Sequence, residues 1–219
     1  MSLRVSIDKC SIVVAGLWNP YIFSPEWIAA NLLQEPLLTP EANFEVAVGP
    51  GVASQIRILL SDVIISPTRQ MVQFQPQSFT DSCLVRLENM AVRMLAILPH
   101  TPLKGYGVNF GFECSTDQNA ELFNAKDYSD LHALDLEPTQ RQIVRNLRHT
   151  QHCTLNLFMS IDVDKNVLNI LCNFHHSPTK EGKLDSQLVN DKVLEYKMFA
   201  LNLLKKVYGE TLEAKSPND

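Results

Sequence analysis

Apolar residues recur every three to four positions in two stretches of the chain, and each stretch predicts an amphipathic helix. The first begins at capping candidates in 80–82 and ends before Pro99 and Pro102, which cannot continue a helix because proline lacks an amide hydrogen. Its apolar stripe is Leu84, Leu87, Ala91, Met94, Leu95 and Leu98. The stripe of the second is Val189, Val193, Tyr196, Ala200, Leu203 and Val207. We therefore expect helices over 80–98 and 186–208.

After Pro102, between the two helices, apolar residues recur at every second position. This period of two predicts a strand over 103–114. One face carries Tyr106, Val108, Phe110 and Phe112, and the other carries Gly105, Gly107, Asn109 and Gly111. Three glycines on one face of a strand leave room for another backbone, a closely packed helix or a ligand.

Further alternation predicts strands over 153–163 and 167–175, joined as an antiparallel hairpin by a turn at 164–166. Shorter strand signals lie earlier in the chain, and Ser24-Pro25-Glu26 has the composition of a helix start. The pattern over 138–149 fits a helix or a strand, and it favours the helix weakly. Residues 115–138 show little periodicity, and so long a stretch without a clear element indicates a functional flap, a mobile excursion or an unrecognised helix.

Together these elements predict an α+β fold, with a largely antiparallel sheet covered on one face by two main helices. We expect a single domain over 1–209, followed by a disordered tail over 210–219. The two halves, 1–100 and 101–209, share an order of strands followed by a helix. An alternative description is therefore two repeated sheet-plus-helix units.

Composition narrows the class of protein. The 219 residues are 45% hydrophobic and 20% charged, as in an ordinary globular protein. A net charge of −5 without runs of Lys or Arg disfavours nucleic-acid binding. Five scattered cysteines without a C-x-x-C pair indicate a reducing compartment. With no apolar stretch long enough to span a bilayer and no signal peptide, we expect a cytoplasmic protein that does not engage a membrane.

The stretch Val72-Gln73-Phe74-Gln75-Pro76-Gln77-Ser78-Phe79 precedes a predicted helix and a glycine-bearing strand. In this it resembles a sporadically distributed bacterial family of uncharacterised proteins. Gln77-Ser78 stands where that family tends to have charged residues, and the usual aromatic residue shortly after the Phe is absent. The resemblance implies a layout of strands and helices, and it implies no activity.

Phosphate-binding, nucleophile-elbow, zinc-protease and calcium-loop motifs are absent from the sequence, and no cofactor is expected. One group of residues has metal-ligand chemistry: His149, His152, Cys153 and His176. Neighbouring strand residues point to opposite faces, so His175 and His176 cannot both join such a site without a bulge. A metal-dependent hydrolase that uses this group with Asp162 and Asp164 is the alternative function.

Trp18, Tyr21 and Phe23 cluster at the first strand-to-helix connection, and aromatic residues there suit a core or an interface anchor. With Gly105, Gly107 and Gly111 they form the candidate binding residues. The leading hypothesis is a non-enzymatic binding or adaptor protein that recognises a protein partner or associates with itself. A further alternative is a small-ligand-binding protein with a pocket between sheet and helix.

Overall fold

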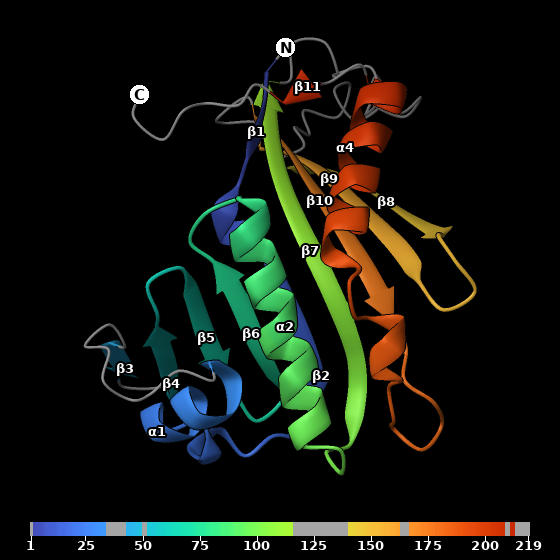
Figure 1. Ribbon diagram of the computed structural model, residues 1–219. Coiled ribbons are helices and arrows are strands. Elements are labelled where there is room, and N and C mark those ends of the chain that lie inside the picture. The colour runs from blue at the N-terminus through green and yellow to red at the C-terminus, as the bar shows by residue number, and fades with distance from the viewer. Residues whose placement is uncertain are drawn as a thin grey trace, which may run out of the picture.

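The protein is an α+β fold built on a mostly antiparallel sheet (Figure 1), as the alternation predicts. The computed structural model describes residues 2–33, 43–49, 52–115, 140–162, 167–208 and 211–212. The predicted disordered tail lies outside these residues except for 211–212, which form a short strand. The 116–138 part of the predicted loop also lies outside them. So does the whole predicted turn over 164–166, which includes Asp164.

The strands are β1 (Ser2–Val5), β2 (Ser11–Gly16), β3 (Asn43–Gly49), β4 (Val52–Leu59), β5 (Val63–Pro67), β6 (Met71–Pro76), β7 (Leu103–Ser115), β8 (Gln140–Arg148), β9 (Thr154–Asp162), β10 (Val167–His176) and β11 (Thr211–Leu212). Their order across the sheet is β3-β4-β5-β6-β2-β7-β10-β9-β8, and all of these neighbours are antiparallel. β1 pairs antiparallel with β7 and parallel with β11.

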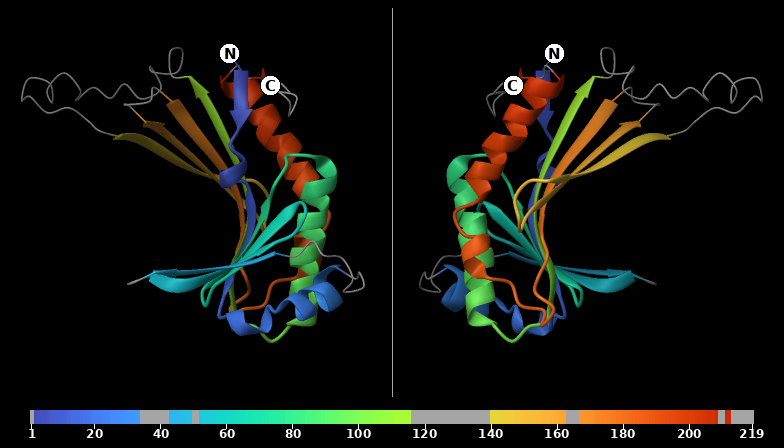
Figure 2. Two further views of the ribbon diagram at one scale, coloured as in Figure 1. Left: turned by 90° about the vertical axis from the view of Figure 1, so that its left-hand side faces the viewer. Right: turned by 90° about the vertical axis from the view of Figure 1, so that its right-hand side faces the viewer.

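The helical elements are α1 (Pro25–Ile28), α2 (Asp81–Ile97) and α4 (Val193–Tyr208), with shorter turns η1 (Ile7–Lys9), η2 (Pro20–Ile22), η3 (Ala29–Leu33) and η5 (Ser186–Leu188). α2 and α4 lie on the same face of the sheet, and the strands at both ends of the sheet extend away from them (Figure 2). Among the described residues the opposite face carries no α-helix, only the short turn η1 over Gly111, and we call it the open face.

The faces of β7 are those that the sequence predicts. Tyr106, Val108, Phe110 and Phe112 are all 1% exposed or less, because they pack beneath the helices. β9 and β10 alternate in the same way, and their buried residues continue this core. α2 begins where Thr80 Oγ1 accepts a hydrogen bond from the Cys83 N–H, and Pro99 follows soon after its end.

Two sequence-based predictions are wrong in detail. Residues 140–148 form strand β8, the other alternative, instead of the weakly favoured helix, because their backbone pairs with β9 along its whole length. The C-terminal helix starts at Val193 instead of Ser186, and 186–188 form only a 3-10 turn. The predicted apolar stripe also differs at its end: Leu204 is 0% exposed, while Leu203 is half-buried.

Candidate functional site

A hollowed apolar surface surrounds residues 17–19, which connect β2 to η2. The connection is held on both sides by backbone hydrogen bonds. The Leu17 N–H donates to the Pro102 carbonyl at 3.0 Å, and the Trp18 N–H donates to the Arg69 carbonyl at 3.1 Å. It therefore lies between the β5–β6 turn and the α2–β7 connection. At Gly16, just before it, a Cβ atom would stand 2.8 Å from the Pro102 carbonyl oxygen, so this close approach requires glycine.

Trp18 forms a fixed floor for this surface. Its indole Nε1–H donates to the Val14 carbonyl at 3.0 Å, and its side chain is only 6% exposed. Phe23 packs edge-on behind the indole with ring centroids 6.2 Å apart, and Trp27 packs edge-on against Phe23 at 5.3 Å. Because these rings support one another, the position of Trp18 is set before any partner arrives.

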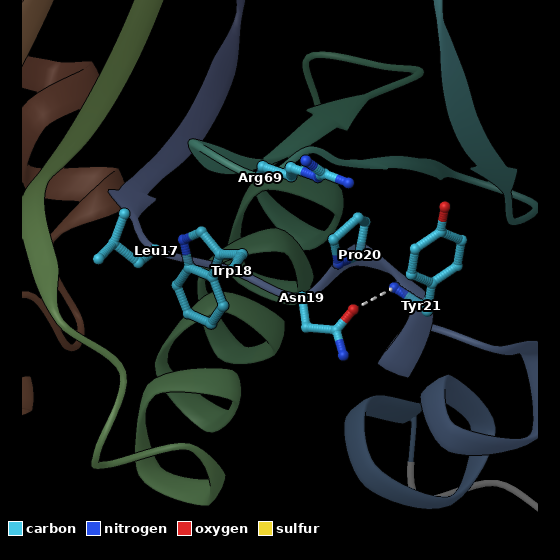
Figure 3. A pocket seen from close by; sticks show the side chains of 6 residues that line it. All are labelled: Leu17, Trp18, Asn19, Pro20, Tyr21 and Arg69. Atoms are coloured by element: carbon cyan, nitrogen blue, oxygen red, sulfur yellow. Dashed lines mark hydrogen bonds between the residues drawn. The ribbon is translucent and has the colours of Figure 1, made fainter.

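The chain beyond Trp18 is fixed by local capping. The Asn19 side chain accepts a hydrogen bond from the Tyr21 N–H at 3.2 Å (Figure 3), and Pro20 occupies the first position of η2. Ser24 Oγ then accepts from the Trp27 N–H and caps α1. These caps turn the Tyr21 ring outward, and it is 78% exposed.

Two hollows flank the connection. One of about 480 Å³ is lined by Leu17, Trp18, Asn19, Pro20, Tyr21 and Arg69 (Figure 3). The other, of about 390 Å³, is lined by 17–19, Ile22 and 97–102. Leu17 is 59% exposed and Ile97 is 38% exposed, so apolar side chains stand above both hollows. We call residues 17–22, Arg69 and 97–102 the Trp18 surface.

The chemistry of the Trp18 surface suits binding. Its ionisable side chains are Tyr21, Arg69 and His100, and none of them takes part in a hydrogen bond or ion pair of its side chain with the rest of the described chain. Trp, Tyr and Arg are the residue types that contribute most to protein–protein affinity. The arrangement offers apolar hollows with a cation at their rim.

The structure separates the predicted binding residues into two groups. Trp18 and Tyr21 belong to the Trp18 surface, and Phe23, 2% exposed, supports it from the core. Gly105, Gly107 and Gly111 lie on the open face of β7. A Cβ atom at these glycines would contact His175, Asn173 and Lys9 respectively. Side chains of β10 therefore take the room beside Gly105 and Gly107, whereas the backbone of Ser6 and Lys9 comes close to Gly111.

The predicted metal ligands are also divided. His176 is 2% exposed beneath α4, whereas His152 is exposed. His176 Nε2 and the Tyr196 hydroxyl form a 2.8 Å hydrogen bond. The buried Cys153 thiol also forms a hydrogen bond with the Tyr196 side chain. His149 packs edge-on against Phe199 at 4.4 Å. Within the described ranges, no three His, Cys, Asp or Glu side chains are grouped to hold a metal ion.

The hairpin register explains part of this division. His175 pairs with Thr154, one residue away from the Leu155 that a turn centred on Lys165 predicts. His175 and His176 do face opposite sides of the sheet, as the sequence predicts: His175 covers Gly105 on the open face and His176 contacts Tyr196 beneath α4.

Burial shifts the pKa values of this histidine group. Desolvation lowers the pKa of His176 from 6.5 to about 4 and lowers that of His149 as well. Desolvation also raises the pKa of the Cys153 thiol, which keeps it protonated at neutral pH. Neutral imidazoles and a thiol in an aromatic environment behave as core residues here.

We expect acid to destabilise the protein through His176. Between pH 6.5 and 4 the unfolded chain binds a proton at this histidine and the folded chain does not, so stability falls as the pH falls through this range. The share of His176 is about 2–3 kcal/mol of unfolding free energy. Urea denaturation of wild type and His176→Gln at pH 7 and pH 4.5 measures it.

Burial raises the pKa of Glu88, so this carboxyl group stabilises the folded protein as the pH falls, opposite to the effect of His176. Glu88 is present in both proteins, so its contribution cancels in the comparison. Equal acid losses in the two proteins would contradict the assignment.

Sequence reasoning missed Arg69, Ile97 and Pro102, which complete the Trp18 surface. They lie far from Trp18 in the chain, and the contacts that bring them together are mainly backbone hydrogen bonds, which leave no residue pattern. Pro102 was recognised only as a helix stop. Ser66-Pro67-Thr68, which precede Arg69, are typical turn residues and indicate an exposed side chain at that position.

None of the described helices is both long and apolar enough to cross a membrane. Comparison of the chain with models of known protein families found no match, and neither did a search of curated proteins.

Proposed function

We propose that the protein is a non-enzymatic binding protein that recognises a protein partner through the Trp18 surface. The observation that carries this proposal is the exposure of Leu17 and Tyr21, 59% and 78%, above hollows with a fixed indole floor. Single exposed apolar residues are common on proteins. Here several of them gather around two adjoining hollows, which is the anatomy of an interface core.

The rigidity of the Trp18 surface supports the same function. Hydrogen bonds from residues 16–18 reach both neighbouring turns, and the Asn19 and Ser24 caps fix the following residues. A surface that is ordered in the free protein loses little conformational entropy on binding. This arrangement favours tight recognition over a transient encounter.

The chemistry of the surface indicates the partner segment. An apolar side chain of the partner would fill a hollow beside Trp18, and an acidic side chain would pair with Arg69 (Figure 3). Arg69 forms no ion pair with another described residue. A second copy of this chain is one candidate for such a partner.

Photo-crosslinking tests the proposal. Benzoylphenylalanine in place of Tyr21 should capture a specific protein in cells, and the same residue in place of Met198, which is 55% exposed on α4, should not. In binding measurements with the captured protein, Tyr21→Ala should cost about 2 kcal/mol, or roughly 30-fold in affinity. Sedimentation of the purified chain shows whether the partner is a second copy.

Leu17→Asp should weaken the same complex, because a carboxylate above the hollow repels an acidic partner and exposes the apolar floor. Met198→Asp is the matched control, since it places the same charge on an exposed apolar position elsewhere. The proposal fails if Leu17→Asp and Met198→Asp bind the captured protein equally well.

The fold is further proposed to consist of two repeated sheet-plus-helix units. The order of elements supports this, because β6 lies beside β2 and is followed by α2, whereas β10 lies beside β7 and is followed by α4. The antiparallel β2–β7 pair would then join the two units at the centre of the sheet.

A further inference from the structure

A row of side-chain amides crosses the open face of the sheet. Asn109 on β7, Asn173 on β10 and Asn156 on β9 lie directly opposite one another in register. Asn156 Nδ2 donates to Asn173 Oδ1 at 2.9 Å, and Asn173 Nδ2 donates to Asn109 Oδ1 at 2.8 Å. The register extends the row to Asn146 on β8 at one end and to Ser11 on β2 at the other.

The hydrogen bonds of this amide row all run in one direction. Asn109 Nδ2 completes the amide row by donating to Ser11 Oγ at 3.1 Å. Each of the three amide nitrogens thus uses one N–H within the row, and an amide nitrogen carries two. The second N–H of each has no partner among the described residues, and neither does the exposed side chain of Asn146.

An apolar row runs parallel to the amide row, two residues further along the same strands and therefore about 7 Å away. It consists of Val144 on β8, Phe158 on β9 and Leu171 on β10, which are opposite one another in register. Phe158 and Leu171 form part of a hollow of about 400 Å³ that Lys9, Gln142, Ser160 and Asn169 also line. Polar side chains therefore border the apolar row on both sides.

The one cation that lines this hollow is neutralised. Lys9 Nζ lies 2.7 Å from Glu113 Oε1 and 2.5 Å from Asn169 Oδ1. Lys9 therefore has its charge and two of its three donors engaged within the protein. The other polar groups of the hollow and of the amide row are amides and hydroxyls.

We propose that this part of the open face is a binding site for a neutral carbohydrate chain. The faces of a sugar ring carry C–H groups, which suit the Phe158 ring and the Leu171 side chain. Its hydroxyls are both donors and acceptors, and side-chain amides offer both functions from one group. The parallel polar and apolar rows would engage the edge and the face of successive sugar rings across β8, β9 and β10.

Charge separates this ligand class from an anionic polymer. A nucleic acid or a sulfated glycan needs clustered Lys and Arg. The cation in the hollow is already paired with Glu113. Arg148, two residues from Asn146 on the same face of β8, adds one exposed cation beside the amide row, which is not a cluster. This site is independent of the Trp18 surface, because Lys9 precedes β2 and Trp18 follows it, at opposite ends of that strand.

The test uses the full-length, isotope-labelled chain titrated with neutral hexasaccharides (cellohexaose, maltohexaose and chitohexaose). At least one should bind with a dissociation constant of about 1 mM or tighter and shift the side-chain amide signals of Asn146 and Asn156. Phe158→Ala should weaken this binding at least tenfold. Asn146→Ala, at an exposed position where the fold is not at risk, should weaken it as well.

Gln73→Ala is the matched control, because Gln73 lies on the open face of β6, outside the amide row and the hollow. It should bind the same saccharide with unchanged affinity. The proposal is overturned if no hexasaccharide shifts the amide signals. It is also overturned if a heparin hexasaccharide or a thymidine oligonucleotide binds more tightly than the neutral sugars with the same dependence on Phe158.

Discussion

Replacement of Glu88 by leucine is expected to lower the free energy of unfolding by about 3 kcal/mol or more. Glu88 lies on α2 and is only 2% exposed. Its Oε1 accepts hydrogen bonds from the backbone N–H groups of Lys192 and Val193, each at 2.8 Å. The first N–H groups of a helix have no partner within the helix. Glu88 therefore caps the start of α4 from a different helix.

The reason for the large effect is that leucine fills the space of Glu88 but accepts no hydrogen bond. Two N–H groups at the start of α4 would then lose their acceptor, and a buried unsatisfied donor costs about 1–3 kcal/mol. Hydrogen exchange at these amides should accelerate more than exchange in the middle of the sheet, because α4 would fray from its first turn.

Glu88→Gln is the matched control for this prediction. Glutamine keeps a side-chain oxygen that can accept both N–H groups and loses only the interaction of a charge with the helix dipole, worth about 0.3–1 kcal/mol. Urea denaturation of both variants measures the difference. If Glu88→Leu is as stable as Glu88→Gln, the hydrogen bonds to Lys192 and Val193 do not hold the helix.

Glu88 also shows where sequence reasoning stops. It lies next to Leu87 and one turn after Leu84, so helical spacing places an acid within the predicted apolar stripe. Its partners at the start of α4 are 104 and 105 positions away. Periodicity describes one element at a time, and it cannot show that one helix caps another.

The central strand was predictable because its two faces differ so strongly. Large apolar residues and glycines alternate along β7, and a period of two is a property of the extended backbone itself. What fills the space beside the glycines was not predictable. Asn173 and His175 reach Gly107 and Gly105 from β10 through its register with β7, and Lys9 reaches Gly111 from the turn η1.

β8 shows the opposite case, in which local preference and structure disagree. Its polar and apolar residues suit a helix about as well as a strand, and the pairing of its backbone with β9 decides the outcome. The Trp18 surface could be predicted from the sequence only in part. The aromatic residues Trp18 and Tyr21 were visible as candidates, whereas the hollows beside them depend on turns that meet only in the fold.

Leu204→Ala is expected to destabilise the protein by about 2–5 kcal/mol, the range for truncating a fully buried leucine. Over 193–207, where the burial of α4 is described, the buried positions are Val193, Tyr196, Ala200 and Leu204, at spacings of three, four and four. This stripe faces α2 and β7. Spacing alone favoured Leu203 and Val207 as the end of the stripe, but Leu203 is half-buried and Val207 is 59% exposed.

Leu203→Ala is therefore the control for Leu204→Ala, because it removes the same atoms from the neighbouring residue of the same helix. A half-buried leucine contributes less, and we expect a loss of about 1 kcal/mol. Both variants keep the helix propensity favourable, since alanine is the best helix former, so the difference in urea-denaturation free energies reports burial alone. A loss for Leu203→Ala that equals or exceeds that for Leu204→Ala would mean that α4 is rotated about its axis. The stripe predicted from the sequence, which ends in Leu203 and Val207, would then face the sheet.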